Sequence, residues 1–396
     1  MLWKNPLNSS PRQALLDISG DWGPIRRYGE LMDSDPAGVY GDLLPELRRA
    51  DWLVTNLEAP MTPGELIVKS GAAFHGEERR MSALTAVPFD AVTLANNHTF
   101  DCGEKGFFRT AELLERDGIA YCGAGKDDTA AFRPLEVTVK GVKIALFNFS
   151  EGEDLMAAAP GKPGVAGWEL ERVENAVWQA REKFHVVIVI VHCGLEYVPT
   201  PPPYVYDAFD RLCAAGADLV AGHHPHVPQG MAVLHGKPAF FSLGNFIFYQ
   251  DNALLCRKLG YRLQVGVNEK GISEIEVRPY ELTPAGARKC DPAVFEPVFR
   301  TVSDCLRERK AMVEAWNGFL RYYGVKGYLD ELSRIVDKMK EDPGKGAAML
   351  RNRVMTLQHR HHWNDGLSRI VAGEIDTAPA WAVKLAEFYF TEQVKK

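Results

Sequence analysis

The sequence lacks a cysteine motif and a long apolar segment. It contains seven scattered cysteines without a Cys-x-x-Cys pair, at positions 102, 122, 193, 213, 256, 290 and 305. An odd, dispersed set of thiols predicts neither a disulfide framework nor a thiolate zinc site, and it favours a reducing compartment. No run of 18 apolar residues is present, and the first residues lack the basic and apolar regions of a secretory signal. These absences predict a soluble, cytoplasmic protein without a membrane span.

An excess of positive charge is also missing. The net charge of −6 argues against a protein that binds nucleic acid by neutralising phosphates. Internal repeats and low-complexity segments are absent as well, so we expect a globular protein. Because 396 residues exceed a typical single domain, one large α/β unit with an appendage is the expected organisation.

Residues 13–284 alternate short apolar runs with helical stretches, which is typical of an α/β fold. We expect strands at 14–19, 52–56, 91–95, 135–139, 143–149, 186–191, 219–221 and 238–243. Helices are expected at 103–117, 169–183 and 204–215. Glycine-containing turns predict two hairpins, one at 140–141 and one that joins strands 261–267 and 272–277.

The chain changes character at about residue 286, where strand patterns stop. We expect helices at 293–309, 312–323, 328–340, 347–362 and 380–395, and therefore an α/β domain at 1–285 followed by a helical extension at 286–396. The extension is basic and the preceding part is acidic. This contrast fits either a cover over a site for an anionic substrate or charge complementarity between the two parts. The cluster from His359 to His362 could reach such a site, but an exposed helix end is the favoured interpretation.

The most informative segment is Gly-His-His-Pro-His at 222–226, which directly follows an apolar run at 217–221. Three imidazoles within four residues at a strand end favour metal binding over a solvated turn.

Other predicted strands also end at residues suited to metal binding or acid–base chemistry. Asp21, Glu58, Asn97 with His98, and His192 follow four different strands. Each has a simpler explanation alone, such as a helix cap, a turn residue or a core histidine. Because loops beyond the carboxyl ends of strands build sites in α/β proteins, we expect these side chains to converge. Mixed oxygen and nitrogen ligands suit Mn, Fe or Zn.

Six motifs occur in a consistent order: Gly-Asp at 20–21, Asn-Leu-Glu-Ala-Pro at 56–60, Leu-Ala-Asn-Asn-His at 94–98, His-Cys-Gly-Leu-Glu-Tyr at 192–197, Gly-His-His-Pro-His at 222–226 and Ser-Leu-Gly-Asn-Phe at 242–246. Together they resemble the CapA family of capsule and poly-γ-glutamate biosynthesis proteins, which has the calcineurin-like metallophosphatase fold. The resemblance covers about residues 13–250. It implies a four-layer αββα sandwich with a dinuclear metal centre, and it does not extend to the helical region.

The resemblance also implies roles for individual residues. The implied metal ligands are Asp21, Glu58 as the bridging acid, Asn97, His192, His224 and His226. His98 is the implied general acid, oriented by Asp101. The candidates for substrate binding are Arg26, Arg27, His223 and Asn245, although a solvated surface pair is the favoured interpretation of the two arginines. Glu196 is a further candidate, whereas Cys193 need not be a ligand.

One departure concerns the number of ions. Position 23 is glycine where the metallophosphatase motif has histidine, which leaves one of two metal positions a ligand short. One or two divalent ions are therefore expected.

The sequence leaves three functional interpretations open. The leading one is a metal-dependent hydrolase that acts on a phosphoester or a γ-glutamyl-type bond in capsule or poly-γ-glutamate-like biosynthesis. Its expected substrate is a small or oligomeric anion, and a biosynthetic ligase is a candidate partner. The alternatives are a non-catalytic subunit of a polymer-synthesis assembly with a vestigial metal site, and a metal-dependent transferase.

Overall fold

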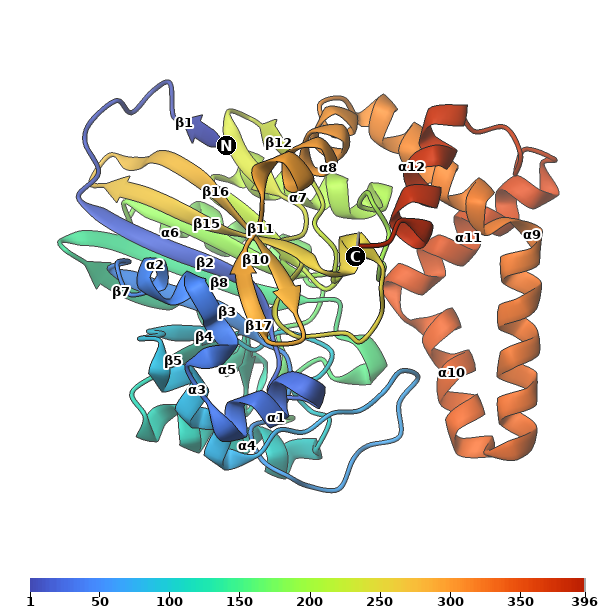
Figure 1. The fold of residues 1–396 in the computed structure, drawn as a ribbon, viewed down its shortest axis with the longest axis horizontal. Helices are drawn as coiled ribbons and strands as arrows, with labels where there is room; N and C mark the ends of the chain where they lie inside the picture. Colours follow the sequence, from blue (N-terminus) through green and yellow to red (C-terminus); the bar gives the residue numbers. More distant parts are fainter. Residues whose placement is uncertain (395–396) are drawn as a thin grey trace.

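In a computed structural model, which describes residues 1–394, two β-sheets lie face to face and helices cover their outer sides (Figure 1). The order in the first sheet is β1 (Leu2–Lys4), β16 (Gly271–Thr283), β15 (Leu259–Asn268), β2 (Ala14–Trp22), β3 (Trp52–Leu57), β4 (Ala91–Thr93) and β5 (Ala120–Cys122). Two further strands extend it: β14 (Asn245–Ile247) pairs with β2, and β17 (Gly286–Lys289) pairs with β16.

The second sheet has six strands. Their order is β12 (Met231–Leu234), β13 (Lys237–Phe240), β11 (Leu219–His223), β10 (Val186–His192), β8 (Val142–Ser150) and β7 (Leu135–Val139). The short strands β6 (Ala124–Gly125) and β9 (Gly164–Val165) form a separate pair. The two predicted hairpins are confirmed, because β7 pairs with β8 and β15 with β16 in antiparallel fashion.

The core follows from the alternation of side chains along each strand. In β3, Val54 lies in the main core, where it joins the apolar residues of the second sheet, whereas Leu53 belongs to the core beneath the outer helices. All seven residues of β10 are buried, as expected for a central parallel strand covered on both faces.

Helices complete the outer layers. Near the first sheet lie α1 (Arg26–Ser34), α2 (Leu44–Leu47), α3 (Met81–Ala86) and α4 (Gly103–Arg116). The second sheet is covered by α6 (Leu170–Ala180) and α7 (Pro203–Ala215), and α5 (Asp128–Ala131) follows β6. This arrangement confirms the predicted αββα sandwich with a C-terminal helical region.

The C-terminal region contains α8 (Pro292–Cys305), α9 (Arg309–Glu341), α10 (Pro343–Met355), α11 (Leu357–Val371) and α12 (Ala380–Thr391). Two helices were expected within α9, and their junction corresponds to a break at Gly324, whose φ is 60°. The single helix expected at 347–362 is wrong, since Thr356 separates α10 from α11. The last position of the helix expected at 380–395 lies outside the described residues. Strand β17 lies after residue 285, and the C-terminal helices begin at Pro292.

The helical region stands at one side of the sandwich (Figure 1). Its base is an apolar cluster in which Trp316, Phe319 and Leu320 of α9 pack against Leu195 and Val198 of the sandwich. Among the helices of residues 1–394, none combines the length and apolar character that a membrane crossing requires.

Candidate metal centre

Six polar side chains converge where parallel strands of the two sheets end. Strands β2, β3 and β4 run parallel in the first sheet, and β8, β10 and β11 run parallel in the second. The predicted ligands Asp21, Glu58, Asn97, His192, His224 and His226 all lie there, and each is at most 7% exposed. The structure therefore brings together the six residues that the resemblance implied as ligands, and all six lie in the strand-end segments marked by the sequence pattern.

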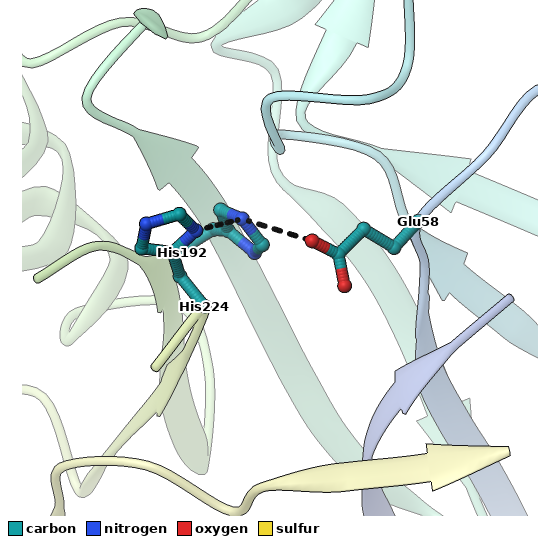
Figure 2. Close-up of side chains that lie close together, drawn as sticks. All are labelled: Glu58, His192 and His224. Carbon is teal, nitrogen blue, oxygen red and sulfur yellow. Dashed lines mark hydrogen bonds and ion pairs between the residues drawn. The ribbon is translucent and has the colours of Figure 1, made fainter. Parts of the chain in front are cut away.

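One group of ligands contains Glu58, His192 and His224, as Figure 2 shows. His192 Nε2 lies 3.5 Å from Glu58 Oε1, 3.1 Å from His224 Nδ1 and 3.0 Å from Asn97 Oδ1. These four side chains offer two imidazole nitrogens, a carboxylate and an amide oxygen to one point. That ligand set can hold a divalent cation.

A second group contains Asp21, Glu58 and His226. His226 Nδ1 lies 3.4 Å from Asp21 Oδ2, and His226 Nε2 lies 3.7 Å from Glu58 Oε1. Glu58 belongs to both groups, so it lies where a ligand shared by two ions, as the resemblance implies, would have to stand.

The electrostatics of the centre fit a bound cation. Within residues 1–394, neither carboxylate oxygen of Glu58 has a hydrogen-bond partner. Burial, followed by the charge of Asp21, raises the pKa of Glu58 well above its usual range. Burial opposes ionisation of Asp21 as well, but His223 and His226 hold its pKa well below the usual value. A divalent cation would place positive charge beside both carboxylates and would favour the ionised form of each.

The histidines of the centre differ from each other. Burial and the neighbouring imidazoles hold the pKa of His192 well below its usual value, and burial lowers that of His224 to about 4. These two rings are neutral and can act as ligands at neutral pH. Burial would also lower the pKa of His226, but Glu58 and Asp21 together raise it to about 10.

The backbone of the histidine loop is strained. His224 and His226 have φ values of 96° and 57°, in the left-handed region that non-glycine residues seldom occupy. Such strain is common where a loop must aim side chains at a site, and here both strained residues face the centre.

A second motif provides a histidine beside the centre. His98 Nδ1 lies 2.6 Å from Asp101 Oδ2, which is the contact expected for a carboxylate that orients an imidazole. Lys69, which sequence reasoning missed, is only 2% exposed and donates to Asp101 Oδ1 at 3.0 Å and to the carbonyl of Asn97. Burial and then Lys69 lower the pKa of His98, while Asp101 opposes this shift. Lys69 lies in a loop without periodicity, so no pattern marked it.

The four candidates for substrate binding lie in different places relative to the cavity. Arg26, at a φ of 53°, lines a cavity at the centre and lies over the ring of Phe74. Arg27 instead donates to the carbonyl of Pro284 and does not line this cavity. His223 and Asn245 lie behind the ligands, where they contact Asp21 at 2.9 Å and His226 at 2.8 Å. Both therefore support ligands from a second layer of contacts.

The structure shows why position 23 has no room for a side chain. A Cβ atom added there would lie 2.5 Å from the ring of Phe248, which stacks on His226. The space for a side chain at position 23 is thus occupied by an aromatic ring. Glu196 forms a further possible ligand group with His224 and His226, although its side chain is 44% exposed.

The cavity at the centre has a volume of about 210 Å³, and the helical region forms part of its wall. Arg353 and His359 line it together with His98, His224 and His226. The favoured expectation of an exposed helix end at 359–362 is wrong for its two outer histidines. His359 reaches the cavity, and His362 is buried against aromatic rings of α9.

Another carboxyl group lies close to the centre, at Glu151. Its Oε1 atom accepts from the backbone N–H of Gly194 at 3.0 Å and from the hydroxyl of Tyr204, whereas its buried Oε2 has no partner among the described residues. Burial raises the pKa of Glu151 to about 8.

Glu151→Gln is expected to remove a pH-dependent loss of stability. Between the unfolded pKa near 4.5 and about 8, the carboxyl group is protonated in the folded chain and ionised in the unfolded chain. Stability must therefore fall as pH rises through this window, by at most about 1.4 kcal/mol per pH unit. Thermal unfolding between pH 5 and 8 should show wild type losing stability relative to the variant. The exposed Glu171→Gln variant is the control, and parallel curves for wild type and Glu151→Gln would contradict the assignment.

These observations define an α/β sandwich protein with a buried His/Asp/Glu centre that can hold divalent metal. The sequence places it more closely: residues 13–250 match the family model described as "Bacterial capsule synthesis protein PGA_cap", and the chain belongs to that family.

Named relatives are found in bacilli. The chain is 30% identical to the PGA biosynthesis protein CapA of Bacillus subtilis (strain 168), over 62% of this chain and 66% of the relative. It is 28% identical to the capsule biosynthesis protein CapA of Bacillus anthracis, over 62% of this chain and 61% of the relative. The matches thus span less than two thirds of the length of these relatives.

Solved structures with a similar fold include two nucleotidases. A 5'-nucleotidase precursor from Thermus thermophilus has a TM-score of 0.45 and 15% identity, over 74% of this chain and 58% of that one. The NAD nucleotidase of Haemophilus influenzae has a TM-score of 0.44 and 14% identity, over 73% of this chain and 56% of that one.

Proposed function

We propose that this protein is a metal-dependent hydrolase that cleaves a phosphoester or γ-glutamyl-type bond of an anionic substrate in polymer biosynthesis. The observation that carries the proposal is Glu58, a buried carboxylate without a hydrogen-bond partner in residues 1–394 that is shared by two groups of ligands. The names of the relatives support the biosynthetic setting. A cytoplasmic location and a biosynthetic ligase as partner belong to the same proposal.

The residues of the centre divide the chemistry between them. Asp21, Glu58, Asn97, His192, His224 and His226 would hold one or two Mn, Fe or Zn ions. A bound divalent ion lowers the pKa of a water molecule and stabilises negative charge on the scissile group. His98, oriented by Asp101, protonates the leaving atom. Lys69 fixes Asp101 and the carbonyl of Asn97, and thereby positions both His98 and the amide ligand.

A non-catalytic subunit is the second candidate, because Phe248 fills the space beside Gly23 where another ligand could stand. A chelation experiment separates the two. Hydrolysis of a panel of phosphoesters and γ-glutamyl amides should require Mn, Fe or Zn and stop with EDTA. His224→Ala should lose both metal and activity, by about 10³-fold or more.

Metal analysis of the purified protein and hydrolysis in ¹⁸O-labelled water complete this test. A protein that holds none of these metals, with a His224→Ala variant that still supports polymer synthesis, would support the non-catalytic subunit. Label that is missing from the product would show transfer to another acceptor in place of hydrolysis.

A further inference from the structure

Arg353 of α10 extends the candidate site beyond the family-matched part of the chain. Its side chain is 12% exposed and lines the cavity that also contains His224 and His226. It lies more than 100 residues beyond the matched segment at 13–250. The helical region therefore contributes a cation to the same cavity as the metal centre.

A buried network orients this guanidinium group. Arg353 Nε donates to Glu331 Oε1 at 2.6 Å. The other oxygen, Glu331 Oε2, accepts from the hydroxyl of Tyr323 at 2.9 Å and from Trp363 Nε1 at 3.1 Å. Glu331 is 8% exposed, so these contacts are shielded from solvent. Glu331 thus holds Arg353 in one orientation, and Tyr323 and Trp363 fix Glu331 in turn. Such support is expected for a preorganised binding group.

The network leaves part of the guanidinium free. Nη1 contacts Asn352 Oδ1, whereas Nη2 has no hydrogen-bond partner among residues 1–394. Arg26 lines the same cavity, and its guanidinium group forms no ion pair with any carboxylate of residues 1–394. In contrast, Lys69 is paired with Asp101.

The two acidic side chains that line the cavity, Glu153 and Glu196, have contacts other than the two arginines. Glu153 accepts from Asn352 Nδ2 at 2.6 Å, and Glu196 Oε1 lies 4.0 Å from His226 Nε2, on the side of the metal centre. Neither forms an ion pair with Arg353 or Arg26 in residues 1–394. The cavity therefore has Glu196 beside the metal ligands, Glu153 held by Asn352, and two arginines with free donors.

We infer that Arg353 and Arg26 bind a carboxylate of the substrate while the bond to be cleaved lies at the metal centre. Guanidinium groups bind carboxylates through paired, charge-assisted hydrogen bonds. The cavity of about 210 Å³ is smaller than the ~300–1,000 Å³ typical of ligand sites, so it accommodates one residue at the end of a substrate. The substrate class is then an acidic residue with a free carboxylate next to the scissile bond, and this conclusion rests on the proposed function.

Binding of glutarate, a simple dicarboxylate, tests the inference without turnover. Isothermal titration of the full, Mn²⁺-loaded chain should show that Arg353→Met weakens binding by about tenfold or more. Arg334→Met is the matched control, since Arg334 also contacts Glu331 but is exposed and does not line the cavity. It should change the Kd less than about twofold. The uncharged glutaramide should not bind.

Three results would overturn the inference: a Kd for glutarate that Arg353→Met leaves unchanged, an equal loss in Arg334→Met, or glutaramide binding as tight as that of glutarate. If Arg353→Met fails to fold because Glu331 loses its partner, the double variant Glu331→Gln/Arg353→Met serves instead, because it leaves no unpaired buried charge.

Failure of this inference can be distinguished from failure of the proposed function. A protein that hydrolyses no ester or amide with any metal contradicts the function, and the glutarate titration still shows whether Arg353 binds a carboxylate. Conversely, an active enzyme whose glutarate binding does not depend on Arg353 contradicts the inference alone.

Discussion

Glu58→Gln is expected to abolish metal binding and to reduce hydrolysis by about 10³-fold or more. The carboxylate belongs to both ligand groups, one with His192 and His224 and one with Asp21 and His226. An amide retains the shape of the side chain but not the negative charge that a shared ligand requires. Loss of this single residue therefore affects both metal positions, whereas loss of any one histidine affects one position first.

Metal content after dialysis and the rate of p-nitrophenyl phosphate hydrolysis measure this effect. Glu151→Gln is a matched control, because Glu151 is also a largely buried carboxyl group near the centre but belongs to neither ligand group. It should retain its metal. In EDTA, Glu58→Gln should unfold at the same temperature as wild type or a higher one, since it replaces a buried carboxyl group that makes no hydrogen bond within residues 1–394. A variant that still binds metal stoichiometrically would contradict the bridging assignment.

His98→Gln is expected to reduce hydrolysis by about 10²–10⁴-fold while metal content stays unchanged. His98 contacts Asp101 and Lys69 but belongs to none of the ligand groups in the described chain. Because a general acid matters most when the leaving group is basic, the loss should be larger for an alkyl phosphate than for p-nitrophenyl phosphate. Burial and Lys69 lower the pKa of His98. The protonated form, and with it wild-type activity, should therefore decline as pH rises.

The His75→Gln variant provides a control in the same loop region, because the ring of His75 has one hydrogen bond within residues 1–394, to the carbonyl of Gly76, and does not line the cavity. It should keep wild-type rates. An equal loss for both leaving groups in His98→Gln, or an unchanged alkaline limb in its pH profile, would exclude the general acid role.

The strand ends were predictable from sequence for a physical reason. Apolar runs identify buried strands, and parallel pairing brings the carboxyl ends of neighbouring strands to one edge, so His192 and His224 of the second sheet could be expected to meet. Asp21 ends a strand of the first sheet, and it joins them because the two sheets pack face to face. The α/β class and the helical region followed from the same patterns, whereas the sandwich of two sheets was implied by the family resemblance. The family resemblance added the pairing of roles, with Glu58 between the two groups.

The remainder of the site depends on contacts that leave no local pattern. Lys69 lies in an irregular loop, and its burial results from loop packing over Asp101. Phe248 and Gly23 are more than 200 residues apart, so their mutual exclusion appears only in three dimensions. Arg353 looks like an ordinary basic residue on an amphipathic helix. Only the packing of α9, α10 and α11 shows that Glu331 holds it at the cavity.

The helical region also contacts the loops around the centre through hydrogen bonds and a stacked ring pair. Lys345 donates to the carbonyls of Lys69 and Gly71, Asn352 to Glu153, and His361 stacks on Tyr204, which contacts Glu151. Figure 1 shows the first of these loops approaching α10. In the proposed function, the residues for bond cleavage lie in the sandwich, whereas Arg353, one of the two arginines proposed to bind the substrate, lies in the helical region. On this proposal, substitutions after residue 290 would change the substrate that is bound while every strand-end ligand stays the same, and the architecture could diversify without changes to its candidate metal centre.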